Sequence, residues 1–180
     1  SGVAVGTVIG FPHGTTSTAA KVAEVRQALA DGASEFDMVI NIGALRSGFD
    51  DAVAADIAAV VEAASGRVTK VILETALLDD EQIARGSRLT ERGGADFVKT
   101  STGFAGGGAT VEHVRLMRDN VGEGVQVKAS GGVRSYADAL AMLDAGATRL
   151  GTSGSAVILG EARRVDAGEE STGAVDASSY

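Results

Sequence analysis

The 180-residue chain contains no cysteine, no tryptophan, one proline and only four lysines. Without cysteine it cannot form a disulfide, a thiolate metal site or a cysteine nucleophile. No apolar run approaches the roughly 20 residues that span a bilayer. No signal-peptide pattern opens the sequence. We therefore expect a soluble, cytoplasmic protein with no membrane partner.

Positive charge is also scarce, because 16 basic residues oppose 24 acidic ones and give a net charge of -8. No basic stripe interleaved with aromatic residues is present, so we expect no nucleic-acid partner. His13 and His113 are far apart in the sequence and match no metal-ligand spacing, so we expect no metal.

The chain is 44% hydrophobic, enough for one domain with a substantial core. Short β-branched runs alternate with longer, alanine-rich segments of helical period, which predicts βα units around a parallel sheet. Several runs are almost continuously apolar, as is typical of strands covered on both faces. The predicted strands are 3–9, 35–41, 68–74, 97–99, 125–129 and 149–151.

Local signals mark where the helices begin and end. Capping boxes are predicted at two helix starts, Asp79 with Gln82 and Ser135 with Asp138. Three predicted helix exits share a Gly-Ala phrase whose glycine suits the left-handed position after a helix: Gly32, Gly94 and Gly146.

The repeated unit favours a TIM (β/α)8-type barrel over a solenoid, because the loops are unequal and contain the polar residues. About six of the eight βα units are visible. Either two N-terminal units are missing from this sequence or the fold departs from the closed form. We expect the barrel domain to span 1–160 and the polar segment 161–180 to be a mobile tail.

Active sites of such barrels lie at the carboxyl ends of the strands, where Asp37, Lys99 and Lys128 are the candidates. Asp37 has apolar neighbours and needs a cationic partner, such as a lysine of a nearby strand. A lysine held among apolar residues beside a second ammonium can lose its proton and attack a carbonyl. The spacing does not decide which lysine is the nucleophile. The structural alternatives are an interior ion pair for Asp37, and solvent-directed amines or phosphate attraction for the lysines.

Glycine-rich loops follow the last two predicted strands, at Gly131-Gly132 and from Gly151 to Ser155. With a short helix at 153–159, they predict a phosphate site, although ordinary turn glycines are the alternative. Arg134 either adds charge there or caps the groove. For His13 we favour a buried side chain that fixes its loop over a proton shuttle. We interpret Glu74, which ends a strand, as polar lining.

Four segments resemble the 2-deoxyribose-5-phosphate aldolase family, which comprises class I aldolases on a (β/α)8 barrel. The resemblance implies that Lys99 forms a Schiff base and that Lys128 lowers the pKa of Lys99. It also implies that Asp37 takes part in a proton relay with an ordered water. The segments are Gly10-Phe-Pro-His-Gly14, Glu35-Phe-Asp-Met-Val-Ile-Asn-Ile-Gly43, Phe97-Val-Lys-Thr-Ser-Thr-Gly103 and Val127-Lys-Ala-Ser-Gly-Gly-Val-Arg134.

The resemblance also implies a reaction, the reversible cleavage of 2-deoxy-D-ribose 5-phosphate to acetaldehyde and D-glyceraldehyde 3-phosphate, with no cofactor. Family members begin with a helix and two strands that nothing here matches. The last residue, Tyr180, resembles a terminal tyrosine of some members that reaches the active site, with a loose polar tail as the alternative. The implied phosphate contacts are Gly103, Gly131, Gly132, Ser153 and Gly154.

Two other functions fit the same residues. Another class I phosphosugar aldolase would share the Schiff base, and an incomplete barrel could serve as a non-catalytic phosphosugar-binding or scaffold protein. An unpaired strand edge would also favour a homo-oligomer.

Overall fold

The structure is a computed structural model that describes residues 2–168. Six strands alternate with seven α-helices and one short 3-10 helix in this part of the chain. In chain order they are β1 (Gly6–Ile9), α1 (Thr18–Ala30), β2 (Glu35–Val39), α2 (Ile42–Arg46), α3 (Asp50–Ala63), β3 (Val68–Ile72), η1 (Thr75–Leu77), α4 (Asp80–Arg92), β4 (Phe97–Lys99), α5 (Val111–Asp119), β5 (Gln126–Ser130), α6 (Tyr136–Asp144), β6 (Arg149–Gly151) and α7 (Ser155–Asp166).

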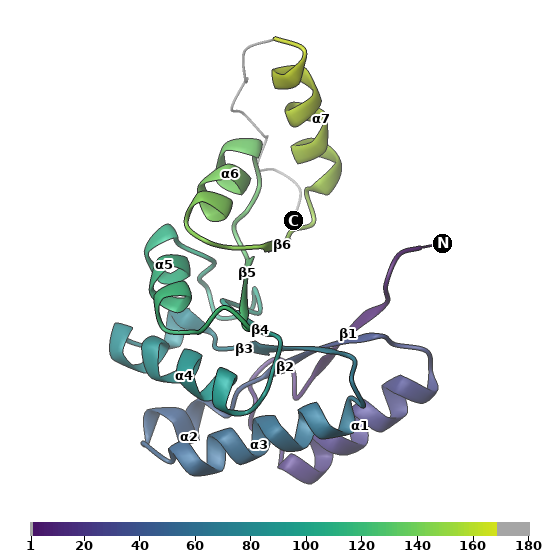
Figure 1. Cartoon of the computed structure of the whole chain (residues 1–180), viewed down its shortest axis with the longest axis vertical. Coiled ribbons are helices and arrows are strands. Elements are labelled where there is room, and N and C mark those ends of the chain that lie inside the picture. Colours follow the sequence, from purple (N-terminus) through teal and green to yellow (C-terminus); the bar gives the residue numbers. More distant parts are fainter. Residues whose placement is uncertain (1, 169–180) are drawn as a thin grey trace.

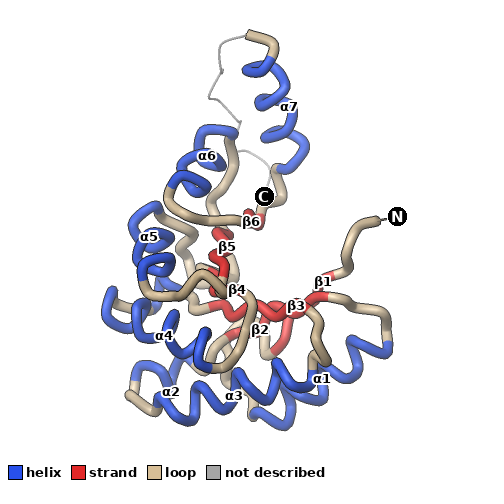
Figure 2. Tube along the Cα trace, viewed as in Figure 1, coloured by secondary structure: helices blue, strands red, loops and turns tan. Residues whose placement is uncertain are grey.

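The six strands form one sheet in the order in which they occur in the chain, and each neighbouring pair is parallel. The sheet follows an arc, with helices along its outer side (Figures 1 and 2). Within residues 2–168, β1 and β6 do not pair with each other. The molecule is therefore a curled half-barrel, which confirms the predicted α/β architecture with six of the eight units.

The hydrophobic core lies between the outer face of this sheet and the helices. Side chains alternate between the two faces of a strand. The outward-facing Phe36, Met38, Val71, Val98 and Val127 are completely buried. Sequestering these side chains from water is the main favourable contribution to holding the helices on the sheet.

The predicted helix boundaries are confirmed at their capping residues. Asp79 with Gln82 and Ser135 with Asp138 both form complete capping boxes, which satisfy backbone N–H groups of the first turn. The three exit glycines all have the expected left-handed backbone, with φ of 96° at Gly32, 80° at Gly94 and 107° at Gly146.

The C-terminal part differs from expectation in one element. The short helix predicted at 153–159 is instead α7, which extends from Ser155 to Asp166 and so crosses the expected boundary at residue 160. Residues 169–180 of the expected tail, including Tyr180, lie outside the described residues. Among the helices of residues 2–168, none has the length and apolar character needed to cross a membrane.

Candidate active site

The inner face of the half-barrel contains charged residues where the outer face contains apolar ones. The strand register places Asp37 beside Lys70, and Lys99 beside Lys128. Paired residues of parallel strands point to the same face, so these four side chains share the interior. Strands β2, β3, β4 and β5 each contribute one of them. The curvature of the sheet brings the four side chains together.

Asp37 lies at the centre of this group. Its Oδ2 accepts hydrogen bonds from Lys99 Nζ at 2.6 Å and from Lys128 Nζ at 2.8 Å. Asp37 is 7% exposed and Lys99 8% exposed, while Lys128 is half-buried. The cationic partner that the sequence requires for Asp37 is therefore present twice, and one carboxylate oxygen joins the two amines.

A third lysine, Lys70, completes the group and was missed by the sequence analysis. Lys70 Nζ lies 2.9 Å from Asp37 Oδ1 and 2.8 Å from Glu35 Oε2. Glu35 in turn pairs with Arg149 of β6, with Nη2 2.9 Å from Oε2. A continuous chain of ion pairs thus links the edge strand β6 to Asp37 through the interior. The signal that could have found Lys70 is its position in the middle of β3, a strand whose other residues are valine, threonine, valine and isoleucine.

The cations of this group control the charge of Asp37. Burial alone would raise the pKa of Asp37, but the charge of Lys99 and the hydrogen bonds from Lys128 and Lys99 hold it far below its usual value of 3.8. Asp37 is therefore a carboxylate at neutral pH. It can hold two amines in place and attract positive charge, but it binds a proton weakly.

Whereas Asp37 is held in its charged form, Lys128 is shifted toward its uncharged form. Burial lowers the pKa of Lys128, and the charges of Lys99 and Lys70 act in the same direction. The hydrogen bond and charge of Asp37 oppose this shift without cancelling it. Lys128 is consequently an amine that gives up its proton more readily than an ordinary surface lysine, at hydrogen-bond distance from the carboxylate shared with Lys99.

The residues expected to contact phosphate lie in three adjacent loops. Gly131 and Gly132 follow β5 with φ of 87° and 78°, which glycine adopts without strain. Gly103 lies in the loop after β4. Ser153 and Gly154 precede α7, and Gly154 is its N-cap with no side-chain hydrogen bond, so backbone N–H groups of the first turn have no capping partner there.

Hydrogen bonds connect these three loops. Ala109 N–H, from the loop that contains Gly103, donates to Gly131 O at 3.0 Å. Thr152 Oγ1 donates to Val133 O at 2.7 Å, which joins the loop after β6 to the loop after β5. The five residues predicted for phosphate binding therefore belong to one connected edge of the molecule. Arg134, in the loop after β5, is exposed.

The interpretation of His13 as a buried loop-fixing residue is wrong, because its side chain is exposed. Other groups fix this loop. Gly10 N–H donates to Glu24 Oε2 at 2.6 Å. Gly14 packs so closely on Ile40 that an added Cβ would overlap the Ile40 carbonyl oxygen.

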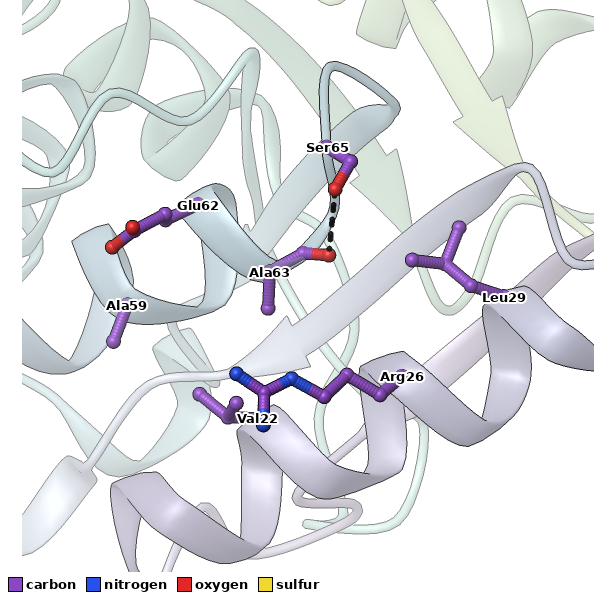
Figure 3. A pocket seen from close by; sticks show the side chains of 7 residues that line it. All are labelled: Val22, Arg26, Leu29, Ala59, Glu62, Ala63 and Ser65. Atoms are coloured by element: carbon purple, nitrogen blue, oxygen red, sulfur yellow. Dashed lines mark hydrogen bonds between the residues drawn. The ribbon is translucent and has the colours of Figure 1, made fainter.

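One groove elsewhere on the surface is unrelated to the strand ends. It lies between α1 and α3, with Arg26 on one side and Glu62 on the other (Figure 3). None of the residues at the carboxyl ends of the strands lines it. Within residues 2–168, no group of three or more histidine, aspartate or glutamate side chains is arranged to hold a metal ion. The interior lysine cluster is therefore the strongest candidate for chemistry.

Known proteins that are similar to this chain are aldolases. The sequence profile of the DeoC/LacD family aldolases matches residues 2–161. Deoxyribose-phosphate aldolase 2 of Staphylococcus aureus is 59% identical over 159 residues, which are 88% of this chain and 72% of that protein.

Two solved structures are also similar in fold and sequence. QR15, an aldolase, superposes with a TM-score of 0.88 at 40% identity, over 94% of this chain and 77% of that one. The tetrameric deoxyribose phosphate aldolase of Aeropyrum pernix gives a TM-score of 0.82 at 36% identity, over 91% of this chain and 70% of that one.

Proposed function

Because the chain belongs to the DeoC/LacD family of aldolases, we propose that it reversibly cleaves 2-deoxy-D-ribose 5-phosphate to acetaldehyde and D-glyceraldehyde 3-phosphate. The observation that carries the proposal is the pairing of Lys99 and Lys128 with one oxygen of Asp37. Two amines held this close allow one to act as nucleophile while the other exchanges protons.

Lys99 is the nucleophile in this mechanism. Its uncharged amine attacks the aldehyde carbon C1 of the open-chain sugar, and loss of water from the adduct gives an iminium ion. The iminium then accepts the electron pair of the C2–C3 bond as that bond breaks. Because the iminium itself is the electron sink, the cleavage needs no metal or organic cofactor.

Lys128 moves the proton. Its uncharged amine takes the proton of the C3 hydroxyl. C3 and its oxygen then become the aldehyde group of glyceraldehyde 3-phosphate. The resulting ammonium returns the proton to C2 of the enamine, and water then hydrolyses the new iminium to release acetaldehyde. The lowered pKa of Lys128, caused first by its burial, supports this assignment. Asp37, whose pKa is held far below its usual value, holds both amines in position and does not carry the proton.

The phosphate of the substrate binds at the loops after β4, β5 and β6. Backbone N–H groups near Gly131 and at the start of α7 are the donors, since a helix N-terminus and a turn of left-handed glycines both favour an anion. The interior charges favour an anion, because Lys70, Lys99, Lys128 and Arg149 outnumber Glu35, Asp37 and Glu74. Anchoring the phosphate fixes the distance between C1 and Lys99.

A product assay tests the proposal. The chain is incubated with 2-deoxy-D-ribose 5-phosphate and, separately, with fructose phosphates, and both acetaldehyde and triose phosphates are measured. We expect acetaldehyde only from the deoxyribose phosphate, and none from the Lys99→Leu variant. Phosphosugar binding without any aldehyde product would identify a binding protein instead. Cleavage of fructose phosphates would identify a different phosphosugar aldolase.

We also propose that the chain forms a homo-oligomer. The strands β1 and β6 are the outer strands of the sheet in the described part of the chain, and such edges favour association. The Aeropyrum pernix relative, which is described as tetrameric, supports this. Light scattering on the eluting protein tests it, and a monomer at all concentrations would contradict it.

A further inference from the structure

Glu74 is held in an unfavourable backbone conformation immediately after β3. Its φ of 60° is in the left-handed region, which among the non-glycine residues of 2–168 only Ser65 shares. Glu74 is 1% exposed, so its carboxylate is almost completely removed from water. Strained residues persist where the surrounding structure fixes them, and they are concentrated at functional sites.

The carboxylate of Glu74 is used to hold one turn of the chain. It accepts hydrogen bonds from Thr102 N–H, at 3.2 Å to Oε1 and 3.3 Å to Oε2, and from the Thr102 hydroxyl. Thr102 Oγ1 accepts in turn from Phe104 N–H at 3.0 Å. Gly103, which we expect to contact phosphate, lies between these two residues with a φ of 93°. Among the described residues, no cation pairs with Glu74, so this turn is what compensates its burial.

The loop that contains this turn, residues 101–109, also contacts two other strand-end segments. Gly107 packs against η1, where an added Cβ would lie 2.7 Å from Ala76 Cβ. Ala109 N–H donates to Gly131 O at 3.0 Å, in the loop after β5. Residues 101–109 therefore connect the segments that follow β3 and β5.

The tip of the turn is in contact with the loop after β1. The Phe104 ring packs edge-on against Phe11, with centroids 5.4 Å apart and an interplanar angle of 89°. Phe104 is otherwise 75% exposed, so this aromatic pair is its main anchor. The turn is thus fixed at its base by Glu74 and at its tip by Phe11.

We propose that Glu74 is a positioning residue for the phosphate end of the substrate, acting through Thr102 to fix the turn that contains Gly103. This inference rests on the proposed function, in which the same turn faces the phosphate. Glu74 does not touch the substrate and has no part in the imine chemistry. Its loss therefore weakens phosphate binding and leaves the reaction of bound substrate unchanged.

Three variants test the inference. Glu74→Gln removes the charge and one acceptor. Thr102→Val keeps the backbone N–H and removes the hydroxyl, with its contacts to Glu74 and to Phe104 N–H. The matched control is Asp96→Asn, which makes the same carboxylate-to-amide change at an exposed side chain whose Oδ2 accepts from Thr69 N–H at 2.8 Å. Asp96 lies at the opposite ends of the strands.

The readouts are the affinity for inorganic phosphate, by calorimetry, and the kinetics on 2-deoxyribose with and without its 5-phosphate. In Glu74→Gln we expect phosphate affinity to fall, and KM for the phosphorylated sugar to rise, each by about tenfold with kcat unchanged. The effect in Thr102→Val is smaller, and activity on the unphosphorylated sugar is unchanged in both. Asp96→Asn matches the wild type throughout.

Equal loss of activity on both sugars, or unchanged phosphate affinity in both variants, would overturn the inference. Should Glu74→Gln fail to fold, Thr102→Val decides the question. If the wild type cleaves neither sugar, the proposed function fails. The phosphate titration then still tests Glu74 on its own.

Discussion

Lys70 Nζ lies 2.9 Å from Asp37 Oδ1, the carboxylate oxygen that neither Lys99 nor Lys128 uses. Asp37 cannot rotate without breaking this contact, because its two oxygens are occupied by amines from three different strands. Lys70 is only 1% exposed and also contacts Glu35, so it is itself fixed. This contact keeps Oδ2 between the two amines of the proposed mechanism.

Lys70→Met should therefore disturb both chemistry and stability. We expect kcat to fall by about 10- to 100-fold as Asp37 moves relative to the amines. The free energy of unfolding should decrease by about 2 kcal/mol for the lost charged hydrogen bonds. Arg92→Met is the matched control, since its ion pair with Asp51 is exposed and should contribute less than about 1 kcal/mol. Urea unfolding and steady-state kinetics measure both effects, and equal behaviour of the two variants would contradict the role of Lys70.

Lys128→Arg separates charge from proton transfer. Arginine keeps a positive charge near Asp37 but does not lose its proton in proteins. We expect kcat to fall by at least about 100-fold, as for loss of a general acid–base group. Lys128→Met should be similarly impaired. Near-normal turnover by Lys128→Arg would show that only the charge at this position matters.

Asp37 should make folding stability depend on pH at the acidic end. Because its pKa in the folded protein is below its usual 3.8, the ionised form stabilises the fold. This contribution is complete above about pH 3.8 and is lost as the pH falls toward the folded-state pKa. The stability difference between the wild type and Asp37→Asn should thus be greatest near neutral pH and decrease below pH 3.8. A difference that stays constant across this range, by urea unfolding, would contradict the ion-pair account.

Gly151→Ala should disturb the site by steric overlap alone. An added Cβ at Gly151 would overlap Ser130 Oγ and lie 3.4 Å from Lys128 Cε. We expect a loss of about 1–3 kcal/mol in unfolding free energy from overpacking, together with lower kcat as Ser130, which follows Lys128 on β5, is displaced. Gly124→Ala is the control, because a Cβ there meets nothing within 4 Å. Thermal unfolding and kinetics of both variants check this, and an unaffected Gly151→Ala would show that the interior has spare room.

The sequence predicted the order and type of the strands well because alternation of β-branched and alanine-rich segments is a local signal. The capping pair Asp79–Gln82 and the exit glycine Gly146 are equally local, and the structure contains both. The length of α7 was predicted less well. Its continuation to Asp166 occurs in a segment whose polar composition is typical of a tail.

The interior ion pairs depend on strand register and sheet curvature, which no local sequence pattern specifies. Asp37 stood out because it is a carboxylate among apolar strand neighbours, and Lys99 because it ends a strand and precedes polar residues. Lys70 meets Asp37 only through the register of β2 with β3, and Arg149 meets Glu35 only because the sheet curls. Burial of His13 was wrongly expected because glycine packing and Glu24, rather than the imidazole, fix its loop.

The central claim is that Lys99 forms an imine with an aldehyde. Incubating the wild type with acetaldehyde and borohydride, followed by intact mass measurement and peptide mapping, tests it most directly. We predict one reduced ethyl adduct per chain, located on Lys99 and absent from Lys99→Leu. An adduct on Lys128 alone, or the same labelling in Lys99→Leu, would contradict the account.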